Sequence, residues 1–447
     1  MQMFRYFAKA AAIAVATASP LAIASAAHAA TDWGKFPGYT LKVKLIGGDQ
    51  YDPLYKRIAE WESATGAKVE ILSSKNGFDL DKELKQDIAA GNINWCAGWD
   101  HTSFMAQYTG LYDDLYKLVP KEVLDSYIQH TLGTAVIDGK LMLLPWHTDV
   151  SDMYYQKDLY DSADNQAKYK AKYGKDLVPP VTIDDFKQQA QFFANPPNLY
   201  GTIFPGKEEG LTGRFYELLV TYGGQLFDDK WKPAFNSDAG VKALEFFKDL
   251  YAAKAVPPGT INYLWDDIGQ SFAAGTVALD YDWPGWAGFF NDPKNSKIAG
   301  KVGVARAPVG PTGKRPGWSG SHGFSVTQAC DNKPAAVSFV EFMTNYDADM
   351  LEARRGLMPA NAKAFDDIIA EVKGKNDAYM TNVFEIWKVS LSEDAYTPPH
   401  IAQWIEFSNA AYPEFQKAIL GQETPKETLD AVEKKATTIM EDAGLLK

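Results

Sequence analysis

Residues 139–160 constrain the fold more than any other part of the chain. Two short apolar segments, 140–144 and 150–155, have the length and composition of β-strands. Between them lies the segment 145–149, which begins with Pro145. Because proline has no backbone N–H to donate to a sheet, Pro145 marks the end of a strand or a bend. The segment 145–149 is therefore predicted to be a crossing between two parts of the molecule and not part of a core.

The N-terminus has the pattern of a secretory signal peptide. Arg5 and Lys9 precede an Ala-rich apolar run, which ends in an A-x-A cleavage pattern at Ala29. Polar residues and Pro20 interrupt the run, whereas a membrane span needs ~20 continuous apolar residues. No cysteine follows the cleavage pattern and no later segment is long and apolar enough to span a bilayer. We therefore expect a cleaved leader, no stable membrane insertion and export to a Gram-negative periplasm.

Length and charge restrict the class further. Cleavage after Ala29 leaves 447 − 29 = 418 residues, which is too long for one ordinary core and predicts two or more lobes. The formal net charge of −12 argues against nucleic acid as a partner, because an acidic surface repels phosphates.

Strand and helix signals alternate along the chain. This alternation predicts α/β lobes with mainly parallel sheets. Thr182 with Asp185, and Thr424 with Glu427, have the spacing of helix capping boxes. The predicted strands cover residues 41–46, 68–72, 93–99, 276–280, 302–306 and 324–327.

The stretch 139–160 reads G-K-hydrophobic-x-x-P-aromatic, then a polar segment, then hydrophobic-Y-Y-x-K-D-L-aromatic. It resembles the first inter-lobe crossing of the carbohydrate-type solute-binding proteins of ABC importers. The breaks at 309–320 and 356–359 resemble the other two crossings, and the segments 222–228, 272–286 and 324–343 also match the family pattern. Together these matches cover nearly all of the mature chain.

The resemblance implies an α/β, two-lobed periplasmic-binding-protein fold with three inter-lobe crossings and mixed, mainly parallel sheets flanked by helices. It implies a binding protein and not an enzyme, without a cofactor, that acts as a monomer. Its partners would be a sugar and, transiently, the transmembrane subunits of an ABC permease. The implied N-terminal lobe comprises 30–146 and 320–356, the C-terminal lobe 150–316 and 360–447, and the hinges lie near 145–150, 309–320 and 356–360.

The chain contains two cysteines, Cys96 and Cys330. In an oxidising compartment they can form one disulfide, and the alternative is two free buried thiols. The resemblance favours the disulfide, because in this family the strand that contains Cys96 lies antiparallel to the strand 324–327. Zinc is not indicated, since neither the cysteines nor the scattered histidines have the spacing of metal ligands.

Candidate ligand-binding residues follow from the rule that ligands bind beyond the carboxyl ends of strands. Indole rings offer flat apolar area to a pyranose, and carboxylates or amides hydrogen-bond its hydroxyls, so the mixture fits a neutral sugar. The resemblance adds that residues 99–101, the residues after Tyr281 and the crossings are the usual contact positions. The candidates are Asp49, Gln50, Trp99, Asp100, His101, Trp146, His147, Asp149, Asp282, Trp283, Trp286, Trp318, Ser319 and Ser321.

Other interpretations stay open at this point. Trp283 and Trp286 can equally cover the edge of a core, and Asp49 can cap the helix that follows it. The same fold could bind an anionic sugar derivative, which would need an arginine in the cleft, or a polyamine, which would need a dense cluster of acids. A secreted glycoside hydrolase would need two opposed carboxylates, for which Asp280 and Asp282 are the possible pair.

Overall fold

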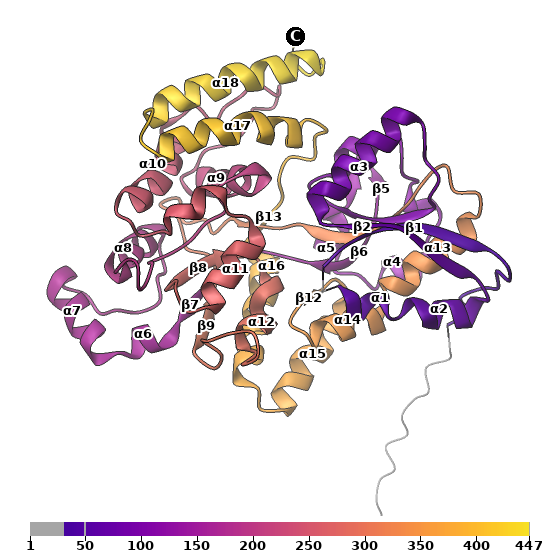
Figure 1. Ribbon diagram of the computed structural model, residues 1–447, viewed down its shortest axis with the longest axis horizontal. Coiled ribbons are helices and arrows are strands. Elements are labelled where there is room, and N and C mark those ends of the chain that lie inside the picture. Colours follow the sequence, from indigo (N-terminus) through magenta and orange to yellow (C-terminus); the bar gives the residue numbers. More distant parts are fainter. Residues whose placement is uncertain (1–30, 49–50, 447) are drawn as a thin grey trace, which may run out of the picture. The chain divides into compact units, whose positions relative to one another are not determined.

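Two β-sheets organise the computed structural model, which describes residues 31–48 and 51–446 (Figure 1). The predicted signal peptide and the candidates Asp49 and Gln50 lie outside the described residues. The larger sheet has six strands in the order β12-β6-β11-β3-β1-β2. These strands are β1 (Thr40–Ile46), β2 (Lys68–Lys75), β3 (Ala97–His101), β6 (Leu144–Thr148), β11 (Ser321–Val326) and β12 (Met358–Pro359).

The smaller sheet has three strands in the order β8-β7-β9. Its central strand pairs antiparallel with both neighbours. Two two-stranded pairs, β4 with β5 and β10 with β13, complete the pairing among the described strands. The bounds are β4 (Val136–Ile137), β5 (Lys140–Leu141), β7 (Asp152–Gln156), β8 (Leu279–Asp282), β9 (Val302–Ala305), β10 (Gly317–Trp318) and β13 (Ala395–Tyr396).

The prediction of mainly parallel sheets is wrong, although the larger sheet is mixed as expected; the smaller sheet is antiparallel. In the larger sheet β1 pairs parallel with β2 and β3, whereas β11 pairs antiparallel with β3 and β6, and β12 antiparallel with β6. The strands β1, β2, β3 and β6 run in one direction. The late strand β11 is inserted between β3 and β6 in the opposite direction, so it replaces a parallel contact with two antiparallel ones.

Helices surround both sheets. Both Thr182 and Thr424 cap their helices, because each hydroxyl accepts a hydrogen bond from the first turn, but only Thr424 with Glu427 forms the complete capping box that was predicted at both positions. The helices are α1 (Asp52–Tyr55), α2 (Ile58–Thr65), α3 (Gly77–Ala90), α4 (Lys121–Leu124), α5 (Gln129–Thr134), α6 (Lys157–Asp161), α7 (Ala163–Tyr173), α8 (Ile183–Phe193), α9 (Glu208–Thr221), α10 (Asp238–Ala252), α11 (Trp265–Ala273), α12 (Ala287–Asn291), α13 (Lys333–Met343), α14 (Tyr346–Ala353), α15 (Ala362–Gly374), α16 (Ala378–Glu393), α17 (Trp404–Ile419) and α18 (Pro425–Asp442).

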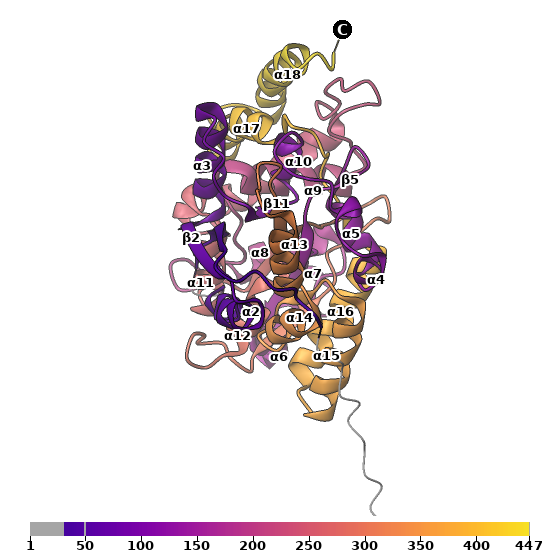
Figure 2. The ribbon, with the colours of Figure 1, turned by 90° about the vertical axis from the view of Figure 1, so that its right-hand side faces the viewer.

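Segments far apart in sequence share the same layers. Helix α13 lies beside the early helix α2 in both views (Figures 1 and 2). There the indole of Trp61 donates a hydrogen bond to Ser338, whose hydroxyl donates to the carbonyl of Trp33. The end of the chain instead forms the adjacent pair α17 and α18. The chain therefore leaves each group of elements and returns to it, as the two-lobed fold requires.

The segment 145–149 was wrongly predicted as a crossing outside any core. Residues 144–148 form β6 inside the larger sheet, and Trp146 is fully buried. Pro145 is tolerated because the pairing of β6 with β11 shifts register at this point, so no regular ladder bond is lost. The chain leaves the larger sheet after Thr148 and enters the smaller one at Asp152. It returns between β9 and β11, and leaves again after β12.

Three strands are displaced by a few residues from their predicted positions, with consequences for the site. Strand β3 reaches His101, β8 reaches Asp282, and β11 begins at Ser321. Asp100, His101, Asp282 and Ser321 were predicted in loops. They therefore lie within strands, where sheet pairing sets the direction of their side chains.

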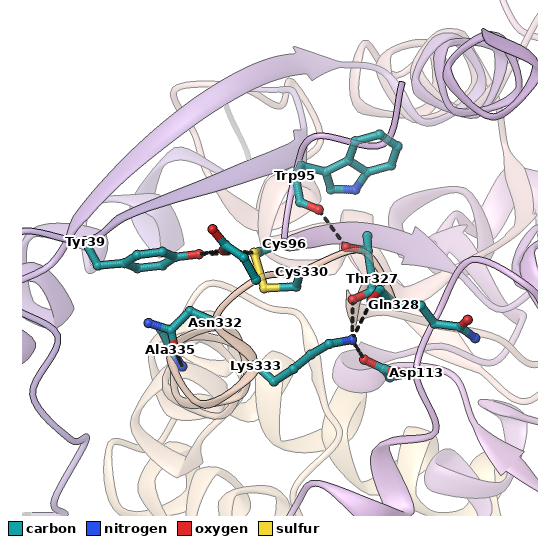
Figure 3. The surroundings of a disulfide bond; sticks show 11 residues. Tyr39, Trp95, Cys96, Asp113, Thr327, Gln328, Cys330, Asn332, Lys333 and Ala335 are labelled. Carbon is teal, nitrogen blue, oxygen red and sulfur yellow. Dashed lines mark hydrogen bonds and ion pairs between the residues drawn. A yellow bond between two sulfur atoms is a disulfide. The ribbon is translucent and has the colours of Figure 1, made fainter. Parts of the chain in front are cut away.

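The disulfide between Cys96 and Cys330 is confirmed (Figure 3). It joins the start of β3 to the turn after β11, whose antiparallel pairing places Ala97 opposite Val326. Thr327 donates to the carbonyl of Trp95 at 2.6 Å beside it. Figure 3 also shows Lys333 reaching back to Asp113 and to the carbonyl oxygens of residues 327 and 328. The register between β3 and β11 is thus fixed covalently.

Candidate functional site

Three histidines lie in a row across neighbouring strands of the larger sheet. The pairing of β11 places His322 opposite His101 of β3 on one side and opposite His147 of β6 on the other. Residues paired in this way carry their side chains on the same face of a sheet. The ring centroid of His322 lies 4.7 Å from that of His101 and 4.3 Å from that of His147. We call these three residues the histidine row.

Two rings of the row have a defined tautomer. The indole N–H of Trp99 donates to Nδ1 of His322 at 3.1 Å, and the backbone N–H of Ser103 donates to Nδ1 of His101 at 3.1 Å. Both donors can only donate, so each Nδ1 must be the unprotonated nitrogen of a neutral ring. Nε2 of His101 and Nε2 of His322 therefore carry the hydrogen and are hydrogen-bond donors.

The imidazoles of His147 and His322 are uncharged near neutral pH, because the pKa of each is lowered. Burial lowers the pKa of His147 to about 4, although the nearby Asp149 carboxylate opposes this shift. Burial and the adjacent imidazoles lower the pKa of His322 well below its ordinary value. Nε2 of His147 is buried and has no hydrogen-bond partner.

Asp149 lies beside the row, in the segment that connects the two sheets. One carboxylate oxygen accepts the backbone N–H of Gly320 at 2.7 Å. The other lies 4.0 Å from Nε2 of His101, and the two side chains are 9% and 14% exposed. A Cβ at Gly320 would lie 3.0 Å from Nε2 of His101, so glycine leaves the room that this ring needs.

The candidate serines support the same region. The Ser319 hydroxyl lies 3.4 Å from Nε2 of His130, and the Ser321 hydroxyl lies 3.0 Å from that of Thr134. The backbone N–H of Ser321 donates to the Thr102 hydroxyl at 3.0 Å. Both serine side chains are fully buried, so in this conformation their hydroxyls hold the segment 319–321 against its neighbours.

The candidates Trp99 and Trp146 pack beside the rings of the row, and Asp100 precedes His101 in β3. The Trp99 ring packs against Gly77 at the start of α3, where a Cβ would approach it to 2.8 Å. Trp146 stacks on Phe324 with a centroid distance of 5.5 Å. Both indoles are nearly or fully buried, so in this conformation they pack against the histidine rings and hold them in place. Asp100 accepts the backbone N–H of His101, and burial raises its pKa to about 8.

A second group of polar residues lies at the end of β8. Arg214 of α9 pairs with Glu217 and with Asp282, at 3.1 Å from the latter, and donates to the Ser151 hydroxyl. Its guanidinium lies 3.9 Å from the ring centroid of Trp283. Burial raises the pKa of Asp282 to about 6, and the charge of Arg214 opposes that shift. In this group, which we call the arginine network, the charge of Arg214 is paired with two carboxylates, while Nε of Arg214 and one oxygen of Asp282 have no hydrogen-bond partner.

The remaining tryptophans differ in their surroundings. Trp283 is partly exposed and packs edge-on against Trp265 at 4.1 Å. Trp286 lies against Gly269 of α11 and stacks on Phe290, which is the position of a core edge. Trp318 is buried beside Trp404, with a centroid distance of 5.6 Å.

Several residues of the site were not predicted from the sequence. His322 and Arg214 occupy central positions, and Glu209 accepts the indole N–H of Trp404 at 3.1 Å. Burial raises the pKa of Glu209, and the hydrogen bond from Trp404 opposes the shift. His322 could have been found only from the order of the sheet, because its neighbours in the row are 221 and 175 residues away in sequence (322 − 101 and 322 − 147). Glu209 carried no signal beyond its place in the first turn of α9.

Two sheets joined by three passages of the chain define the two-lobed class of α/β binding proteins. The family described as bacterial extracellular solute-binding protein matches residues 24–350. The chain therefore belongs to this family, whose members are the solute-binding components of ABC transporters. Such proteins bind small molecules and present them to a permease. No helix within residues 31–48 and 51–446 is long and apolar enough to cross a membrane.

Individual relatives agree with this assignment. A probable ABC transporter-binding protein of Deinococcus radiodurans is 27% identical over 336 residues, which cover 72% of this chain and 74% of the relative. Maltose-bound T. maritima MalE3 superposes with a TM-score of 0.77 at 24% identity, covering 90% of this chain and all of that one. A solute-binding protein of Agrobacterium vitis S4 with bound D-mannitol superposes with a TM-score of 0.76 at 21% identity, covering 91% of this chain and 99% of that one. At these identities the superpositions establish the shared fold alone.

Proposed function

We propose that this protein is a periplasmic receptor that captures an uncharged carbohydrate or polyol between its two lobes and delivers it unchanged to an ABC permease. The observation that carries the proposal is the polarity of the site. The histidine row offers N–H donors and a free ring nitrogen, and Asp149 offers an acceptor beside them. Hydroxyl groups both donate and accept, so they match this mixture.

An aromatic surface complements the polar one. Trp283 is partly exposed, and Arg214 and Trp265 hold its ring in place. An indole fixed in this way offers flat apolar area to the C–H face of a sugar. The maltose and D-mannitol bound to the two structural relatives are consistent with such a ligand.

The arginine network argues against an anionic ligand. Arg214 is 3% exposed and is shared by two carboxylates, so it has no charge to spare for a phosphate or sulfonate. A polyamine is disfavoured for a different reason. An ammonium group can only donate hydrogen bonds, and it would face the N–H groups of His101 and His322.

The glycoside hydrolase is the weaker alternative. It required Asp280 and Asp282 to face a scissile bond, but Asp282 pairs with Arg214. Asp280 is fully buried with both carboxylate oxygens unpartnered, and burial raises its pKa well above the ordinary value. Neither carboxylate faces an accessible space in this conformation.

The proposed lobes follow the two sheets. One lobe comprises 30–146 and 320–356 and the other 150–316 and 360–447, with hinges near 145–150, 309–320 and 356–360. The first hinge is placed best at residues 149–151, because β6 continues to Thr148. A ligand held between the lobes would bias the hinges toward the closed form, which a permease can recognise. We further propose a monomer whose leader is removed at Ala29.

The test is a thermal-shift screen of the mature protein against neutral sugars, polyols, phosphorylated and sulfonated sugars, amino acids and polyamines. A ligand at 100 times its dissociation constant stabilises the folded state by about 2.7 kcal/mol, which a melting curve resolves. We expect a shift with one group of neutral hydroxylated compounds and recovery of the unchanged ligand. A shift confined to charged solutes, or turnover of a glycoside, would refute the proposal.

A further inference from the structure

The distance between His101 and Asp149 suggests how the site recognises its ligand. Nε2 of His101 lies 4.0 Å from the free carboxylate oxygen of Asp149. This distance is too long for a direct hydrogen bond. It is the span of two hydrogen bonds that meet at one oxygen atom, because two bonds of about 2.8 Å across this gap enclose an angle of about 90°.

The two ends of the gap have opposite hydrogen-bonding polarity. Nε2 of His101 carries a hydrogen because Nδ1 accepts the backbone N–H of Ser103. The Asp149 oxygen accepts, and the other oxygen of the same carboxylate is held by Gly320. A group between them must accept on one side and donate on the other. A hydroxyl does both, whereas an ammonium only donates and an ionised phosphate only accepts.

The same residues superficially resemble a metal site. One ring nitrogen each of His101 and His322 and a carboxylate oxygen of Asp149 lie within 4.8 Å of one another. Two metal bonds of about 2.1 Å across the 4.0 Å gap would enclose an angle of about 145°, far from tetrahedral. A metal at Nε2 would also need Nδ1 to donate outward, but Nδ1 of both rings faces a donor.

The surroundings leave room at the His101 side of this gap, and both side chains are mostly buried. Gly320 is the residue under the His101 ring, and any larger side chain would push the ring away. Asp149 belongs to the segment 149–151, through which the chain passes from the larger sheet to the smaller one. A group bound in the gap would therefore tie this hinge segment to the end of β3.

We infer that His101 and Asp149 form a clamp for a single ligand hydroxyl group, and that this clamp selects hydroxylated solutes over charged ones. The inference rests on the proposed function and adds which pair of atoms reads the ligand. Trp99 and Ser103 act as positioning residues, because they fix the tautomers of His322 and His101.

The first experiment is the substitution Asp149→Asn. The amide oxygen can still accept from Gly320, but an NH2 group then faces the N–H of His101, and a hydroxyl between them loses its acceptor. The probes are D-mannitol, ribitol, maltose and D-tagatose, measured by calorimetry. Since losing a hydrogen bond to a charged group costs about 1.5–3 kcal/mol, we expect affinity to fall roughly 10- to 100-fold. The matched control is Asp349→Asn, a fully buried carboxylate that accepts the backbone N–H of Asn361 away from the row and should leave affinity unchanged.

The second experiment reads the tautomers without any ligand. Long-range 1H–15N spectra of histidine-labelled protein at pH 7.5, assigned with His101→Gln and His322→Asn, should show both rings with the hydrogen on Nε2. Addition of ZnCl2 should leave these signals in place. A hydrogen on Nδ1 of His101, or a zinc-induced shift that His322→Asn abolishes, would overturn the clamp.

The two proposals fail in distinguishable ways. If a neutral compound binds the wild-type protein and Asp149→Asn equally well, the clamp is wrong and the proposed function stands. If no neutral compound binds the wild-type protein, the proposed function is wrong and the clamp falls with it.

Discussion

The histidine row and the arginine network use buried polarity in opposite ways. In the arginine network the charge of Arg214 is paired within the protein with Glu217 and Asp282, and the atoms left without a hydrogen-bond partner, Nε of Arg214 and one oxygen of Asp282, belong to these paired groups. In the histidine row Nε2 of His147 has no partner, and His101 and Asp149 stop 4.0 Å apart. Buried polar groups that lack a partner are costly, so they persist where something else provides one.

The difference assigns a separate task to each region. The row supplies unfilled hydrogen-bonding positions, which suits recognition of hydroxyl groups. The network supplies a rigid support for Trp283, whose ring lies over the guanidinium of Arg214. Polar specificity would then come from the larger sheet, and apolar contact area from the end of the smaller one.

The substitution Arg214→Met should have the largest effect on stability. It leaves Glu217 and Asp282 buried without a cation, and breaking a buried pair in this way costs about 3–5 kcal/mol. Chemical denaturation of the purified variant measures the loss. The control is Arg354→Met, which removes a half-exposed pair with Glu371 and should cost less than about 1 kcal/mol. Equal losses for the two variants would show that the network is not the tightly coupled unit described above.

Removal of the disulfide should destabilise the larger sheet, which carries the histidine row. Cys96 and Cys330 are separated by 234 residues, and the bond fixes the register of β3 against β11. The double substitution of both cysteines with serine should lower the free energy of unfolding by about 2–4 kcal/mol. Ligand affinity should fall as well, because this register aligns His101 with His322. Affinity unchanged beside a clear loss of stability would separate the disulfide from the site.

Acid should destabilise the protein through the row. The pKa of His147 is lowered to about 4, so the unfolded chain binds this proton more readily than the folded one. The contribution of His147 to stability is full above about pH 6.5 and is lost as the pH falls toward 4. At pH 4 this loss amounts to about 3 kcal/mol. The comparison is wild type against His147→Gln, unfolded in urea at pH 7 and pH 4. Asp100, whose pKa is raised to about 8, acts in the opposite direction and is present in both proteins. An identical acid sensitivity in the two proteins would contradict the neutral row.

Trp283→Ala should produce the smallest change, and it concerns affinity more than stability. Loss of one partly exposed indole should weaken sugar binding about tenfold, since aromatic contacts contribute about 0.5–1.5 kcal/mol beyond area burial. Trp286→Phe is the matched variant, because that ring packs against α11 and should change affinity less than about twofold. The reverse result would exchange the roles of these two tryptophans.

The two-lobed fold and the helix caps were predictable from the sequence, whereas the disulfide was favoured over two free thiols only through the resemblance to the family. Capping depends on residues three apart, and the order of short motifs along 139–160, 222–228 and 272–286 identifies the family pattern. The direction of the strands was not predictable, because β11 enters between β3 and β6 from a distant part of the chain. Pro145 was misinterpreted because a shift in register, which no local pattern reveals, accommodates it within β6.

The candidate site was predictable only as a set of residues. His101, His147 and Asp149 follow strand signals and were selected for that reason. Their alignment with His322 depends on the sheet order. Trp99 and Trp146 pack against the rings of the row because β3 and β6 continue further than the sequence indicated. The pairing of Arg214 with Asp282 joins a helix to a strand 68 residues later, a contact that spacing alone does not predict.

The most direct test of this account compares one neutral ligand with its charged derivative. Isothermal titration of the mature protein should use the tightest-binding neutral sugar or polyol of the screen and the phosphate ester of the same compound. With Arg214 already paired and the histidine row uncharged, the neutral compound should bind at least about 100-fold more tightly, since each 1.4 kcal/mol is a factor of ten. If the phosphate ester binds equally well or better, a cation must be available in the site, and the central claim of an uncharged, hydroxyl-reading site is wrong.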